Sequence, residues 1–148
     1  MPTDLGLKYK PSWRGNYAGM LHEDYPVWER WLDKNEGWFN EIYYNVRIGG
    51  PDFKNTKLSL DPEYAKIWYD LNAKRIDALG VTDNEVWIIE VTSRPGLRAI
   101  GQLATYLALW MDDPVIKKLP RAVLIADFLD PDLAKMLKYY GMFSFQNG

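Results

Sequence analysis

The stretch Arg75–Tyr106, RIDALGVTDNEVWIIEVTSRPGLRAIGQLATY, decides the fold of this chain. Its first part predicts a hairpin with strands over Ala73–Val81 and Glu85–Thr92, because two apolar runs flank a polar turn at residues 82–84. The run Val86–Val91 is almost continuously apolar, which predicts a strand buried on both faces. A hairpin with one buried strand therefore forms the centre of the predicted sheet.

A helix follows this hairpin. Pro95-Gly96 ends the second strand, and apolar residues at helical spacing predict a helix over Leu97–Trp110. Outward from this stretch, the same patterns predict helices over Tyr25–Asn35, Pro62–Asn72 and Pro131–Tyr140, and strands over Asn40–Ile48, Arg121–Phe128 and Met142–Gln146. Asp24 lies two residues before Pro26, and Asp130 lies directly before Pro131. Each aspartate is expected to cap the helix that follows. Alternating helices and strands indicate an α/β sandwich, with helices flanking a mixed central sheet.

The length of 148 residues suits a single domain, which we expect over residues 21–148. Residues 1–20 have no clear periodicity and form a basic arm, in which Lys8, Lys10 and Arg14 outnumber the lone acidic Asp4. Composition favours a folded protein, with 47% hydrophobic residues, and no apolar run is long enough for a membrane span. We therefore expect a cytoplasmic protein, or a virion component if the source is viral.

Residue counts exclude several classes of site. There are no cysteines, which excludes disulfides, zinc–thiolate sites and a cysteine nucleophile, and His22 is the only histidine. A net charge of −2 leaves only local patches for nucleic-acid binding. The 7 Trp, 10 Tyr and 5 Phe exceed what a core of this size needs and indicate an aromatic surface for a protein partner.

Two carboxylates lie on the adjacent strands of the hairpin. Asp77 shares a strand face with Arg75, and Glu90 shares one with Thr92 and Arg94, because side chains alternate with period two. Glu90 ends an apolar run, where a charge is costly unless it has a partner or ligand. Asp77, Glu90 and the carbonyl of Val91 could together hold a hard cation such as Mg²⁺. With 20 acidic residues in the chain, a chance pair is the competing interpretation.

The predicted helix after the hairpin carries a polar stripe. Arg98, Gln102 and Tyr106 recur every four residues on a helix that is otherwise apolar. Guanidinium, amide and phenol groups can hold a phosphate. An ordinary solvent-facing stripe is the alternative.

Asp77 in RIDALG, Glu90 in IIEVTSR, and Gln102 with Tyr106 in GQLATY together resemble the PD-(D/E)XK nuclease superfamily, in particular its RecB-like branch. The resemblance implies a restriction-endonuclease-like three-layer sandwich and hydrolysis of DNA phosphodiesters with Mg²⁺ or Mn²⁺. It implies that Asp77 and Glu90 are metal ligands, and that Gln102 and Tyr106 support the site and contact the DNA backbone. His22, Glu23 or Glu29 could supply the further ligand that this branch often adds.

The chain departs from the family pattern at one catalytic position. The family lysine is replaced by Thr92, which carries no charge, so Arg94 or Arg75 would have to supply a cation. Arginine stays protonated and cannot act as a base. A second departure is the helix predicted over Pro62–Asn72, between the first strand and the Asp77 strand.

Three functions remain open from the sequence. The first is a metal-dependent deoxyribonuclease with a degenerate site formed by Asp77, Glu90, Thr92 and Arg94. The second is a non-catalytic adaptor of a larger assembly, such as a phage head–tail connector, which keeps the nuclease fold and binds a protein through the arm and aromatic surface. The third is DNA binding without hydrolysis, through the basic arm and the pair Arg94 and Arg98.

Overall fold

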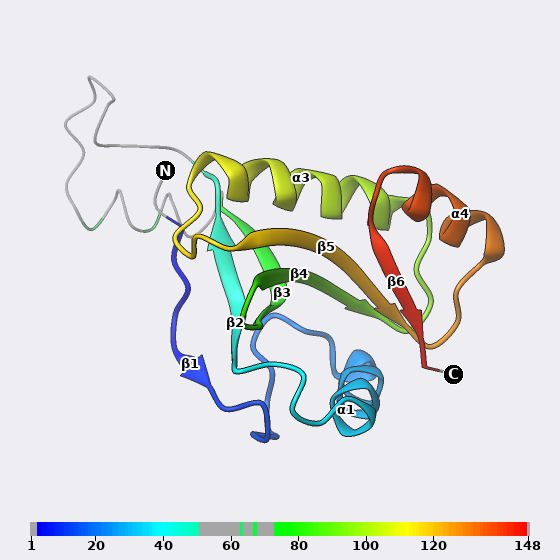
Figure 1. Ribbon diagram of the computed structural model, residues 1–148, viewed down its shortest axis with the longest axis horizontal. Coiled ribbons are helices and arrows are strands. Elements are labelled where there is room, and N and C mark those ends of the chain that lie inside the picture. Colours follow the sequence, from blue (N-terminus) through cyan, green and yellow to red (C-terminus); the bar gives the residue numbers. More distant parts are fainter. Residues whose placement is uncertain (1–2, 51–62, 64–66, 68–72, 148) are drawn as a thin grey trace.

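The computed structural model describes residues 3–50, 63, 67 and 73–147 (Figure 1). In chain order its elements are β1 (Lys8–Tyr9), the 3-10 helix η1 (His22–Asp24), α1 (Tyr25–Lys34), β2 (Glu41–Ile48), β3 (Lys74–Val81), β4 (Glu85–Thr92), α3 (Arg98–Asp112), β5 (Leu119–Ala126), α4 (Pro131–Tyr139) and β6 (Phe143–Gln146). These bounds confirm the predicted elements within a few residues, except that β1 and η1 were not predicted. Apart from Glu63 and Ile67, both helical, the helix predicted over Pro62–Asn72 lies outside the described residues.

The six strands form one mixed sheet in the order β1-β2-β3-β4-β5-β6. Neighbours from β1 to β4 are antiparallel, whereas β4, β5 and β6 are parallel to one another. The predicted hairpin is the β3–β4 pair, in which Val81 lies opposite Val86. Strands β4, β5 and β6 are parallel because α3 and α4 each return the chain to the same end of the sheet.

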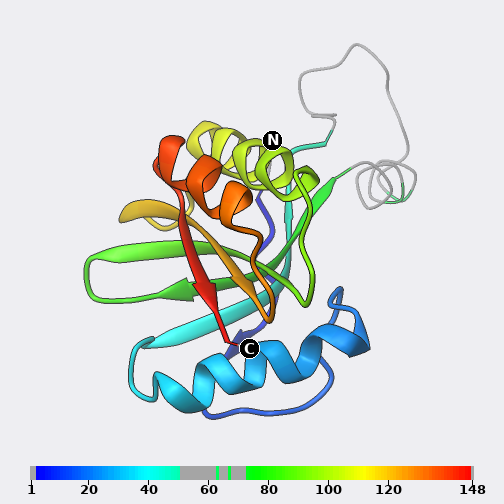
Figure 2. The same ribbon diagram turned by 90° about the vertical axis from the view of Figure 1, so that its right-hand side faces the viewer.

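Helices cover both faces of the sheet (Figure 2). On one face α1 buries Trp28 and Trp31 against Ile89 and Val123. On the other, α3 and α4 cover the opposite side chains of the same strands, among them Ile88 and Leu124. Residues 86–89 of β4 are all 5% exposed or less, which confirms the prediction of a strand buried on both faces.

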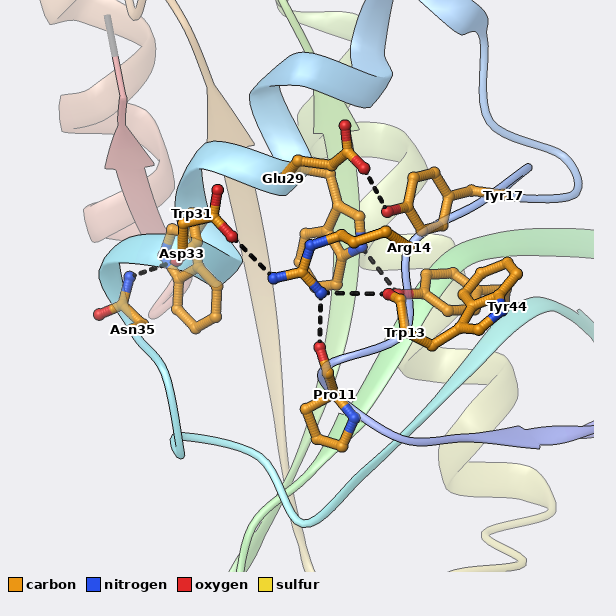
Figure 3. Close-up of polar contacts among 10 residues, drawn as sticks. Pro11, Trp13, Arg14, Tyr17, Glu29, Trp31, Asp33, Asn35 and Tyr44 are labelled. Atoms are coloured by element: carbon orange, nitrogen blue, oxygen red, sulfur yellow. Dashed lines mark hydrogen bonds and ion pairs between the residues drawn. The ribbon is translucent and has the colours of Figure 1, made fainter.

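The N-terminal arm packs onto the domain through aromatic rings (Figure 3). Tyr17 is fully buried, and its hydroxyl donates a hydrogen bond of 2.8 Å to the carboxylate of Glu29. The ring of Trp13 lies 5.4 Å from that of Tyr17 and 5.8 Å from that of Tyr44. The domain itself therefore holds the arm in place.

The charges of the arm also pair with the domain. Arg14 forms an ion pair of 2.8 Å with Asp33 and donates a further hydrogen bond to the carbonyl of Pro11 (Figure 3). Lys8 lies 3.4 Å from Glu41. These acidic partners offset two of the positive charges on which DNA binding by the arm would depend.

The two predicted helix caps differ in outcome. Asp130 accepts a hydrogen bond of 2.8 Å from the N–H of Asp132, which confirms it as the cap of α4. Asp24 occupies the predicted N-cap position of α1, but its side chain makes no cap hydrogen bond there. Its carboxylate instead accepts a hydrogen bond of 2.9 Å from the N–H of Ser93, beyond the end of β4.

Candidate functional site

A pocket of about 440 Å³ opens where β3 and β4 separate. Eight of the residues singled out from the sequence line it: Arg75, Asp77, Glu90, Thr92, Arg94, Arg98, Gln102 and Tyr106. They come from β3, β4, the loop after β4, and α3. The topology therefore brings residues from both halves of the quoted stretch to one place.

The separation of the two strands explains the position of Asp77. Residue pairing between β3 and β4 ends at Ala78 opposite Ile89. One step further, the carboxylate of Asp77 accepts a hydrogen bond of 2.9 Å from the N–H of Val91. On the other side, β2 bends at Asn45, whose backbone has a positive φ of 52°. At this fork, the point where β3 and β4 separate, the hydrogen bond from Val91 to Asp77 takes the place of backbone pairing. The carboxylates of Asp77 and Glu90 lie beside it.

Asp77 and Glu90 form a close carboxyl pair. Burial raises the pKa of Glu90, and the neighbouring charge of Asp77 raises it further. Burial also raises the pKa of Asp77, against the effect of the Val91 N–H, which favours the charged form. Oxygen Oε2 of Glu90 is buried and has no hydrogen-bond partner. Two such groups cannot both ionise cheaply without a cation, so their raised pKa values favour a state in which the pair keeps a proton near neutral pH.

Asp24 is a third carboxylate on the pocket wall, and sequence reasoning did not single it out. It is only 4% exposed, and burial raises its pKa although the N–H of Ser93 opposes the shift. Its negative charge raises the pKa values of both Asp77 and Glu90. An aspartate shortly before a proline is typical of a helix cap. The contact of Asp24 with Ser93 spans 69 residues, so no local pattern in the sequence indicates it.

The polar stripe of α3 faces the pocket. Tyr106 is 8% exposed and packs in the core between α3 and the sheet, and Gln102 is half-buried. Burial raises the pKa of Tyr106, and the carboxylates of Glu90 and Asp77 add to the shift. The alternative of a solvent-facing stripe is wrong for Tyr106 and Gln102. Leu97, the first residue of the helix predicted from apolar spacing, is 69% exposed.

Three arginines surround the carboxyl pair on the pocket rim. Arg75, Arg94 and Arg98 are exposed, and all line the pocket. Within the described ranges, neither Arg94 nor Arg98 takes part in an ion pair. Thr92 is half-buried and lines the same pocket. The site therefore combines an acidic floor with a basic rim.

The residues considered as a further ligand from the first helix region lie elsewhere. His22 packs its ring 4.7 Å from that of Tyr25, and Glu29 accepts the hydroxyl hydrogen bond of Tyr17. Neither these residues nor Glu23 line the pocket. Of the acidic residues in this region, Asp24 is the one that lines the pocket.

The arm contributes a wall to the pocket without filling it. Gly19 and Leu21 line the pocket beside Asp24. Gly19 has a φ of +82°, and a Cβ there would lie 2.4 Å from the side-chain oxygen of Asn45. Glycine is therefore required for the arm to pass this close to the bend in β2.

Comparison with protein families, curated proteins and solved structures finds no match to this chain. Among the described residues, no group of three or more His, Cys, Asp or Glu side chains is arranged to hold a metal ion. In the same part of the chain, every helix is too short or too polar to cross a membrane.

Proposed function

We propose that this protein is a metal-dependent DNA phosphodiester hydrolase of the PD-(D/E)XK type, with a modified active site. The observation that carries the proposal is the carboxyl pair of Asp77 and Glu90, which lies at the fork of two strands inside a pocket with a basic rim. The order of the Asp77 strand, the Glu90 strand and the helix with Gln102 and Tyr106 supports it.

The carboxyl pair suits a hard cation. Mg²⁺ is commonly bound through one or two carboxylates while it keeps several waters. Asp77 and Glu90 would supply these carboxylates, and a cation would offset the repulsion that raises their pKa values. Oε2 of Glu90 is buried without a hydrogen-bond partner, and a cation would compensate it. When bound, Mg²⁺ or Mn²⁺ polarises a phosphate and lowers the pKa of a bound water.

The basic rim suits the phosphate. Arg94 and Arg98 can donate paired hydrogen bonds to phosphate oxygens and offset the charge that develops there during hydrolysis. Asp24 holds the segment that carries Arg94, because it binds the N–H of the preceding residue, Ser93. The carbonyl of Ser93 accepts hydrogen bonds from the N–H groups of Asp127 and Phe128, which fixes the same segment from β5.

A non-catalytic adaptor that keeps this fold, such as a phage head–tail connector, is the second candidate. The observation in its favour is Thr92, which provides neither a positive charge nor a base at the position of the family lysine. Exposed aromatic side chains on β6 and near it offer a protein-binding surface. Retention of the carboxyl pair, the rim arginines and an open pocket favours hydrolysis over this alternative.

A cleavage assay decides between the two. The wild type is incubated with single- and double-stranded DNA, with Mg²⁺ or Mn²⁺, beside Glu90→Gln and the exposed control Glu36→Gln. Hydrolysis by the wild type and by Glu36→Gln that is lost in Glu90→Gln supports the proposal. Absence of cleavage with either metal by folded wild-type protein overturns it and leaves the adaptor.

A further inference from the structure

The outer edge of β6 (Phe143–Gln146, FSFQ) is open in the structure. β6 is the last strand of the sheet, and no described strand pairs with its second edge. In Figure 2, which views this side of the molecule, β6 lies between α4 and α1. Edge strands are usually protected by a charge, a proline or a bulge, and β6 has neither a charged residue nor a proline.

The direction of the hydrogen-bonding groups on β6 follows from one contact. The N–H of Asn147 donates a hydrogen bond of 2.7 Å to the carbonyl of Ala126 on β5. Successive residues of a strand point their backbone groups to opposite edges. Phe143 and Phe145 therefore direct their backbone groups toward β5, and Ser144 and Gln146 direct theirs outward.

The side chains on this edge are aromatic and already held in place. Phe143 is 43% exposed and Phe145 is 36% exposed, and both lie on the face of the sheet that α1 covers. The ring of Phe145 stacks on Trp87 at 5.8 Å, and Arg121 lies over the ring of Phe143 at 4.9 Å.

Side-chain bonds at the end of β6 fix the strand as well. The side-chain amide of Asn147 donates to the carbonyl of Val27 at 3.2 Å, and Gln146 accepts a hydrogen bond from the N–H of Leu129 at 3.1 Å. A strand that is ordered beforehand loses little freedom when it binds a partner.

We propose that β6 pairs antiparallel with β6 of a second copy of this chain, about a twofold axis at Ser144. In this register the outward N–H and C=O of Ser144 exchange two hydrogen bonds with Ser144 of the other copy. Phe143 then lies opposite Phe145 of the other copy at a non-hydrogen-bonded position, where side chains of opposed residues are closest. The strand is its own complement in this register, because it opposes aromatic to aromatic residues and brings no like charges together.

Sedimentation equilibrium of the full chain over a range of concentrations tests the proposal. We expect a monomer–dimer equilibrium for the wild type and a monomer for Ser144→Pro, which removes an outward N–H that β5 does not use. Ser144→Ala keeps that N–H and should dimerise like the wild type. Circular dichroism checks that the proline variant is folded.

A cysteine variant tests the register and does not depend on the proline variant. Opposed residues of a hydrogen-bonded antiparallel pair have Cα atoms about 5.5 Å apart, within the range of a disulfide. The chain has no cysteine, so Ser144→Cys should oxidise to a covalent dimer faster than the exposed control Ser12→Cys. A wild type that stays monomeric, a folded Ser144→Pro that still dimerises, or equal oxidation of the two cysteine variants overturns the proposal.

Discussion

The carboxylate of Asp77 accepts a hydrogen bond from the backbone N–H of Val91 at the point where β3 and β4 stop pairing. This bond lets the two strands diverge without leaving the N–H of Val91 unsatisfied. It also places Asp77 beside Glu90, the residue before Val91. One contact therefore stabilises the fork and assembles the acidic floor of the candidate site.

Removing the acceptor at position 77 should destabilise the protein. In Asp77→Ala the N–H of Val91 loses its partner, and a buried unsatisfied group of this kind costs about 1–3 kcal/mol. Asp77→Asn keeps an oxygen acceptor and lowers the repulsion on Glu90, so its free energy of unfolding should stay close to that of the wild type. Urea unfolding of both variants measures the difference. Equal stability of the two variants would show that the bond to Val91 does not hold the fork.

The carboxyl pair should make stability depend on pH. The pKa values of Asp77 and Glu90 are raised in the folded state, so the folded protein holds protons that the unfolded chain releases. The free energy of unfolding is therefore highest below the ordinary carboxyl pKa, about 4, and falls as pH rises toward the raised folded values.

Glu90→Gln isolates this effect. Without divalent cations its stability should increasingly exceed that of the wild type as the pH rises from about 4 toward about 9, the raised pKa of Glu90, by about 1.4 kcal/mol for each unit of pKa elevation that it removes. At pH values near or below about 4, where the wild-type pair is protonated, the two proteins should be alike. Urea titrations across this range measure the difference, with Glu36→Gln as the matched control. A constant difference at every pH argues against a coupled carboxyl pair.

If the proposed function holds, introducing a lysine at position 92 should raise the hydrolytic rate. Thr92 lines the pocket two residues after Glu90, where the resemblance to PD-(D/E)XK nucleases would place a lysine, so Thr92→Lys places an ammonium group beside the carboxyl pair. One well-placed electrostatic donor contributes about 10²–10³-fold to the rate of a reaction that develops negative charge. Single-turnover cleavage of a labelled duplex measures the gain, and Thr92→Met controls for side-chain length. A lysine variant no faster than the methionine variant would mean that the rim arginines already fill this role.

The rim arginines should account for part of the salt dependence of DNA binding. Each phosphate contact contributes a slope of about −0.9 to the dependence of log K on log salt concentration for duplex DNA. The double variant Arg94→Gln/Arg98→Gln should lower the magnitude of that slope by up to about 1.8. Lys117→Gln, an exposed change beyond the far end of α3, should leave it unchanged. Fluorescence anisotropy in Ca²⁺, to prevent cleavage, supplies the measurement; identical slopes would place the DNA elsewhere.

Local patterns in the sequence predicted most of the fold, because strand alternation and helical periodicity are local properties. The hairpin, the buried strand β4 and the cap Asp130 follow from neighbouring residues alone. The edge strand β1 could not be predicted in this way, because it has only two residues and forms through pairing with β2. The tyrosines and tryptophans of the arm pack on residues distant in sequence, so their burial had no periodic signal.

The candidate site was predictable in part for the same reason. Asp77, Glu90, Gln102 and Tyr106 have fixed spacing on regular elements, and the pocket brings them together. Asp24 belongs to η1 and reaches the pocket through its contact with Ser93, 69 residues away. No local pattern distinguishes this aspartate from a helix cap. The bond between Asp77 and Val91 likewise depends on where the two strands separate, which alternation does not specify.

Binding of Mn²⁺, followed by electron paramagnetic resonance at neutral pH, tests the central claim most directly. We expect the wild type and Glu36→Gln to remove one equivalent of Mn²⁺ from the free-ion signal, and Mg²⁺ to compete for the same site. The double variant Asp77→Asn/Glu90→Gln, with its fold checked by circular dichroism, should leave the free-ion signal unchanged. Equal Mn²⁺ binding by the wild type and this double variant, or none by the wild type, would contradict a metal site at the fork of β3 and β4.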